Sequence, residues 1–83
     1  MIDADQIIGE LKDKVAPLVA KHGLTGFIGI PMKQGFYESV SLTSVRNLCH
    51  WTKGRGSMAV HTLEVIDKMA SAIIDHDNGK PPY

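Results

Sequence analysis

The sequence is poor in cysteine and in aromatic residues, and it has no long hydrophobic run. Its single cysteine cannot form a disulfide within the chain, which is typical of a protein in a reducing compartment. No apolar run approaches the roughly 18 residues that a membrane-spanning helix needs. The acidic N-terminus also lacks the basic-then-apolar order of a secretory signal. We therefore expect a cytoplasmic protein that has no membrane partner.

Motifs for catalysis and for metal binding are absent as well. The sequence contains neither a Gly-x-Ser-x-Gly element nor a convincing pair of carboxylates, and no pair among its four histidines has the spacing of a zinc site. Cys49 and His50 are adjacent, so on a helix they would point about 100° apart and could not act as nucleophile and base. With 83 residues the chain also has little room for a substrate pocket. We expect no enzyme activity, no catalytic residues, no metal site and no cofactor.

The chain has no net charge, but its charges are unevenly distributed. Nine Lys and Arg residues balance nine Asp and Glu residues. Residues 33–56 carry a net charge of +3, whereas residues 1–32 carry −1 and residues 57–83 carry −2. A locally basic surface matters more for the binding of an anionic partner than the total charge does. The excess of positive charge in the middle of the sequence fits an anionic partner, and it fits an ordinary solvated surface equally well.

A chain of this length forms a single domain, residues 1–83, near the lower size limit for independent stability. Association with a second copy would help to stabilise it, so we expect a homo-oligomer. The first segment predicts a helix over about residues 4–22, because its apolar residues recur at helical spacing. We expect Pro17 to kink this helix or to end it early, and Gly23 to stop it.

The last segment predicts a helix over about residues 62–77. Thr62 can cap its N-terminus, Gly79 can end it, and the proline-containing tail, residues 79–83, cannot continue it. Its apolar side chains recur every three or four residues and are expected in the core. They are Leu63, Val65, Ile66, Met69, Ala70, Ala72 and Ile73.

The middle of the chain has two interpretations. In one, a β-hairpin at about residues 26–42 packs on the helices and gives an α+β fold. In the other, Pro31 begins a short helix that ends near Glu38, and Ser41 caps a further helix, which gives a mainly α fold. Periodicity alone does not decide between the two.

A resemblance to a known family favours the mainly α fold. The sequence contains SVSLTSVRNL at residues 39–48, GRG at residues 54–56 and TLEVIDKMASAI at residues 62–73. This order resembles the second half of the helix-turn-helix domain of Cro/CI-type, lambda-repressor-like proteins. It departs from the family at Ser39, where the family usually has Gly, and in a longer loop before the last helix. The resemblance implies a small helical domain with a helix-turn-helix over about residues 31–53.

The resemblance also implies a DNA-binding site. The recognition helix would run from Ser41 to about Lys53, with Val45 and Leu48 facing inward. Its outward side chains would meet base edges in the major groove, and the basic residues after it would contact phosphates. The implied DNA-binding residues are Thr43, Ser44, Arg46, Asn47, His50, Lys53 and Arg55.

The first functional hypothesis is therefore a small DNA-binding transcriptional regulator of the phage or mobile-element kind, which binds double-stranded DNA as a homodimer. A second hypothesis is an inhibitor or accessory factor, also of phage type, that acts through contacts with a protein partner. A third is a module that binds a phosphate-bearing ligand at residues 53–57, where two glycines and two cations could form an anion-binding nest.

Overall fold

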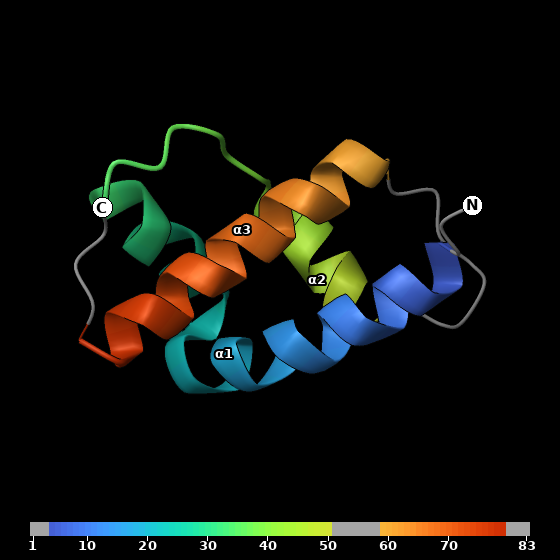
Figure 1. The fold of residues 1–83 in the computed structure, drawn as a ribbon, viewed down its shortest axis with the longest axis horizontal. Helices are drawn as coiled ribbons and strands as arrows, with labels where there is room; N and C mark the ends of the chain where they lie inside the picture. The colour runs from blue at the N-terminus through green and yellow to red at the C-terminus, as the bar shows by residue number, and fades with distance from the viewer. Residues whose placement is uncertain (1–3, 51–58, 80–83) are drawn as a thin grey trace.

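The computed structural model describes residues 4–50 and 59–79, which form three α-helices and no β-strand (Figure 1). Helix α1 spans Ala4–Lys33, α2 spans Leu42–His50 and α3 spans Val60–Asp77. The prediction of a small, mainly α domain is confirmed, and the alternative hairpin over residues 26–42 is wrong. The phosphate-binding loop predicted at residues 53–57 and the tail after Gly79 lie outside these ranges.

Helix α1 is broken into two arms at Gly23. The residue has φ 76° and ψ 167°, a conformation that is essentially restricted to glycine. The first arm, residues 4–22, matches the predicted N-terminal helix, and the second arm, residues 24–33, leaves it at an angle (Figure 1). Gly23 therefore stops the first helix as expected and redirects the chain.

The expected kink at Pro17 is not observed. Helical backbone continues through this residue, and Gly23 has the only non-helical dihedral angles within α1. Pro17 lies on the exposed side of the first arm. There water can hydrogen-bond to the carbonyl that proline leaves without an amide donor, so the helix tolerates the residue.

The second arm differs from both structures predicted for this part of the chain, the hairpin at about residues 26–42 and the short helix from Pro31 to Glu38. Leu24, Phe27, Ile28 and Pro31 follow one another at spacings of three and four, and Phe27 and Pro31 are fully buried. This period buries one face of a helix, whereas a strand would alternate its faces every second residue. The short helix expected from Pro31 to Glu38 is therefore wrong, because Pro31 lies in the last turn of α1 and residues 36–41 are not helical.

A Schellman motif ends the second arm. The Phe36 N–H donates to the Pro31 carbonyl at 3.0 Å, and the Gly35 N–H donates to the Met32 carbonyl at 3.2 Å. Gly35 has φ 89°, the left-handed conformation that this motif requires. Phe36 packs against the core, which is the apolar contact that commonly accompanies the motif. The chain then reaches α2 through residues 36–41.

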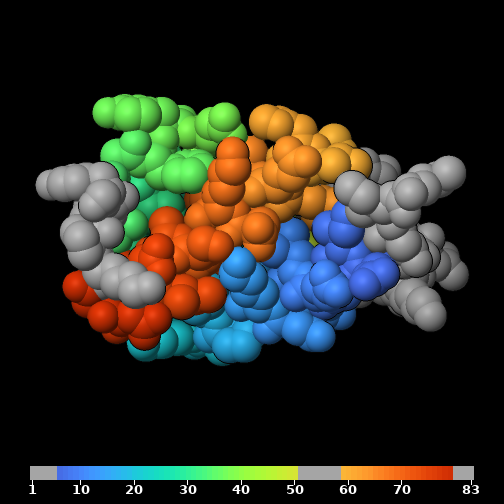
Figure 2. Space-filling model, viewed as in Figure 1, coloured from blue at the N-terminus to red at the C-terminus, as the bar shows by residue number. Residues whose placement is uncertain are grey.

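Helix α3 runs parallel to the first arm of α1. Lys14 Nζ donates to Asp67 Oδ1 and to Ser71 Oγ, both at 2.8 Å, while His22, later in α1, contacts Asp77, later in α3. The face seen in Figure 2 is formed mainly by these two helices, and little of α2 is visible on it. Helix α2 packs against α1 and lies behind α1 and α3 in the view of Figure 1. The core that the three helices enclose consists of Leu11, Val15, Leu18, Phe27, Val40, Val45, Leu48, Leu63, Val65, Ile66, Met69, Ala70 and Ile73.

The predicted apolar face of α3 is buried except for Ala72, which is partly exposed, and the start of the helix differs from the prediction. The helix begins at Val60, its N-cap is Ala59, and no side chain caps it. Thr62 lies within the first turn and is not the cap, because neither Val60 nor His61 breaks the helix before it. Gly79 has φ 76° and its N–H donates to the His76 carbonyl at 3.1 Å, which ends the helix as expected. In the part of the chain described, no helix is both long and apolar enough to cross a membrane.

Replacing Gly23 should test the role of the break in α1. We expect Gly23→Ala to lower the free energy of unfolding by about 1–3 kcal/mol, because a side chain is strained at this φ and ψ. An added Cβ meets nothing within 4 Å, so the loss reports backbone strain and no steric clash. Urea unfolding followed by circular dichroism measures it.

Gly9→Ala is the matched control. Gly9 lies exposed within the first arm, and a Cβ there also meets nothing within 4 Å. Alanine should stabilise the helix by about 0.5–1 kcal/mol at this position. Equal effects of the two substitutions would show that the conformation of Gly23 is not a constraint.

Candidate nucleic-acid interface

Ser41 fixes the start of α2. The Ser44 N–H donates to Ser41 Oγ at 3.1 Å, and the Val45 N–H donates to the Ser41 carbonyl at 3.2 Å. Ser41 is therefore the N-cap that the sequence predicts, and such a cap contributes about 1 kcal/mol to helix stability. The two hydroxyl oxygens of Ser41 and Ser44 also lie 3.0 Å apart.

One face of α2 is apolar and is covered by the rest of the protein. Val45 and Leu48 are fully buried, as expected for the inward face. Each contributes about 1.5–3 kcal/mol in burial, more than the cap does, so these two side chains are what chiefly holds the helix in place. Cys49 lies partly buried beside them. Burial raises the pKa of its thiol, against an opposing effect of Lys12, so the group is a poor nucleophile at neutral pH.

The opposite face of α2 is a polar stripe. Thr43, Arg46, Asn47 and His50 are all exposed and follow at spacings of i, i+3, i+4 and i+7, so they line one side of the helix. No carboxylate is present in α2. Together the stripe offers a guanidinium fork, an amide, a hydroxyl and an imidazole, groups that donate hydrogen bonds to base edges and phosphates. We call these four residues the α2 stripe.

Ser44, Lys53 and Arg55 were the other expected contacts. Ser44 is only partly exposed and takes part in the cap, so it does not belong to the α2 stripe. Lys53 and Arg55 lie outside the described residues, as does the end predicted for the recognition helix near Lys53. The structure therefore brings four of the seven predicted residues together on one surface.

The connection before α2 is longer than in the usual motif. A helix-turn-helix joins its helices through three or four residues, whereas residues 34–41 separate the second arm of α1 from α2 (Figure 1). The helix that precedes α2 is the second arm, residues 24–33, and not residues 31–38. Its apolar spacing at Leu24, Phe27, Ile28 and Pro31 is the signal that sequence reasoning missed.

A polar hollow of about 320 Å³ lies where α2 and α3 begin. His61 Nε2 is 4.0 Å from Glu38 Oε2 across it, and both side chains are largely exposed. The hollow is lined by Glu38, Ser39, Val40, Ser41, Ser44, His61, Thr62 and Val65. Because it holds an acidic side chain beside its hydroxyls, it is less suited to an anion than the α2 stripe.

A cluster of ionisable groups joins α1 to the end of α3. His22 Nε2 lies 3.0 and 3.1 Å from the two carboxylate oxygens of Asp77, and Lys21 Nζ lies 3.2 Å from one of them. His76 Nδ1 is 3.4 Å from Asp77 Oδ1. The hydrogen bond from His22 above all, with those from Lys21 and His76, lowers the pKa of Asp77 to about 2, although partial burial opposes this. The sequence gives no local signal for this cluster, because His22 and Asp77 are 55 positions apart.

No comparison links the chain to a known protein: no family model matches it, and neither a curated protein nor a solved structure is significantly similar. Among the described residues, no group of three or more His, Cys, Asp or Glu side chains is placed to hold a metal ion. The geometry of the α2 stripe is therefore the basis for a functional proposal.

The Asp77 cluster should make the free energy of unfolding depend on pH in the acidic range. Because folding lowers the pKa of Asp77 from its ordinary 3.8 to about 2, its contribution to the free energy of unfolding is complete above about pH 5 and is lost as the pH falls through 2. We therefore expect Asp77→Asn to be less stable than wild type at pH 5 to 6 and to approach it near pH 2. Urea unfolding at a series of pH values measures the difference.

Asp13→Asn removes another carboxylate, an exposed one on α1, and serves as the control. Its stability relative to wild type should change much less over the same pH range. A constant difference between Asp77→Asn and wild type from pH 6 to 2 would contradict the role assigned to the cluster.

Proposed function

We propose that the protein binds double-stranded DNA through the α2 stripe. The observation that carries the proposal is the alignment of Thr43, Arg46, Asn47 and His50 on one exposed face of a capped helix without carboxylates. The major groove of DNA admits an α-helix, and it displays hydrogen-bonding groups that such side chains can read. The proposal is a binding function and includes no catalytic step.

Three residues of the stripe have distinct roles in this proposal. Arg46 donates two hydrogen bonds to a guanine, and Asn47 pairs with an adenine through its amide. Thr43 lies one turn earlier, near the N-terminus of the helix, where it reaches a phosphate or a thymine methyl. Lys53 and Arg55 follow in the sequence and add phosphate contacts, which supply much of the affinity and its salt dependence.

We further propose that the protein acts as a dimeric transcriptional regulator related to the Cro/CI-type repressors. The support for this relationship is the resemblance of residues 39–48 and 62–73 to the sequence pattern of that family. A dimer would place two copies of α2 in successive major grooves about 34 Å apart. It would therefore recognise a site with two-fold symmetry.

Exposed apolar side chains favour a second candidate, binding of a protein partner. Tyr37 is 92% exposed and Leu42, at the start of α2, is 44% exposed. Tyrosine is common in protein interfaces, because its ring is both apolar and able to form hydrogen bonds. The salt dependence of DNA binding distinguishes the two candidates, since a protein-binding surface predicts no affinity for DNA.

The first experiment is a fluorescence anisotropy titration of mixed-sequence duplex DNA at low and moderate salt. Wild type should bind, and its affinity should fall steeply with salt, because binding releases counterions from phosphates. Absence of binding at both salt concentrations would reject DNA as the partner. A preferred site can then be selected from a random pool of duplexes.

Arg46→Ala should weaken binding to the preferred site by about 5- to 150-fold, the value of one bidentate base contact, and should weaken mixed-sequence binding much less. Lys53→Ala should weaken both alike, as expected for a phosphate contact. Lys68→Ala removes the same charge from the exposed surface of α3 and should change neither affinity by more than about twofold. Equal losses from Arg46→Ala on both kinds of DNA would contradict its assignment as a base contact.

A further inference from the structure

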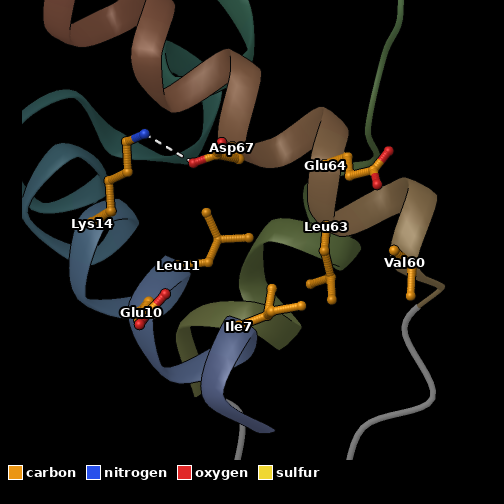
Figure 3. A pocket seen from close by; sticks show the side chains of 8 residues that line it. All are labelled: Ile7, Glu10, Leu11, Lys14, Val60, Leu63, Glu64 and Asp67. Atoms are coloured by element: carbon orange, nitrogen blue, oxygen red, sulfur yellow. Dashed lines mark hydrogen bonds and ion pairs between the residues drawn. The ribbon is translucent and has the colours of Figure 1, made fainter. Parts of the chain in front are cut away.

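A groove of about 350 Å³ lies between α1 and α3, and none of its lining residues comes from α2. Its floor is apolar. Ile7, Leu11 and Leu63 converge there from the two helices, as Figure 3 shows. Leu11 and Leu63 are nearly covered, but Val60 at the start of α3 remains 52% exposed. Among residues 4–50 and 59–79, none fills this small apolar depression.

The rim of the groove is acidic. Glu10 stands on the α1 side and Glu64 on the α3 side, and both are exposed (Figure 3). Gln6 Nε2 donates to Glu10 Oε1 at 3.2 Å, which restrains the carboxylate at the edge. At one end of the groove Lys14 is bonded to Asp67, so these two charges largely cancel. A net charge of about −2 remains over an apolar floor.

We propose that this groove is a docking site for a partner protein segment that presents one apolar anchor side chain flanked by lysine or arginine. The volume lies at the lower end of the range for ligand pockets, so it suits one large side chain better than a continuous helix face. The acidic rim on both sides selects cationic neighbours for that anchor. Charge complementarity thus defines the chemistry of the occupant.

The same charges argue against other occupants. A second copy that docked symmetrically would bring Glu10 and Glu64 against their own counterparts, and like charges in an interface are costly. Nucleic acids and acidic peptides would meet the same repulsion. The groove and the α2 stripe also share no residue, so the docking site does not depend on the DNA-binding proposal.

The test uses a pair of synthetic helical peptides titrated into the full chain. One carries a central leucine flanked on each side by lysines, and its twin carries glutamates in place of the lysines. Methyl NMR follows Ile7, Leu11, Val60 and Leu63. We expect the lysine peptide to shift these methyl signals in a saturable manner and the glutamate peptide to leave them unchanged.

A charge exchange on the protein makes the test specific. Glu10→Lys/Glu64→Lys should weaken the lysine peptide by about fivefold or more and should bind the glutamate peptide in its place, since two exposed ion pairs become two repulsions. Asp13→Lys/Glu38→Lys changes the net charge equally but away from the groove, so it should keep the original preference. Circular dichroism verifies that both variants are folded.

Three outcomes would overturn the proposal. The first is saturable binding of the lysine peptide that leaves the groove methyls unshifted. The second is an unchanged preference for the lysine peptide in Glu10→Lys/Glu64→Lys. The third is a shift of the groove methyls that follows protein concentration alone, which would make a second copy the occupant.

Discussion

The fold depends on one residue, Gly23, whose positive φ interrupts helix α1. The break lets residues 4–33 cover two sides of the core, since Val15 on the first arm and Phe27 on the second are both fully buried. A continuous helix of 30 residues would be about 45 Å long, longer than the 35 Å of the whole molecule. The contact between His22 and Asp77 lies next to this break and joins it to the end of α3.

Much of the helical content could be predicted from periodicity and from residues that end helices. Ser41 and Gly79 act where the sequence indicates, because capping and left-handed glycine are local effects of a few neighbouring residues. Errors arose where a local rule competed with burial. Pro31 is typical of a helix start. Its spacing from Phe27 places it on the buried face of a helix instead, and in the structure it lies buried in the last turn of α1.

The candidate site could be predicted only in part, for a similar reason. The orientation of Arg46 and Asn47 follows from the helical period once Val45 and Leu48 are assigned to the core. The groove between α1 and α3, and the pairing of His22 with Asp77, bring together residues more than fifty positions apart. Such contacts depend on how the helices pack, and one sequence contains no local signal for them.

The position of Cys49 has a consequence for the dynamics of α2. The thiol lies partly covered on the inner side of the helix, in a chain with no other cysteine. Only two fully buried side chains hold this helix, so it belongs to the parts of a protein that open locally before the whole chain unfolds. Each opening exposes the partly covered thiol more fully to a labelling reagent. Conditions that loosen α2 should therefore raise the rate at which Cys49 is alkylated.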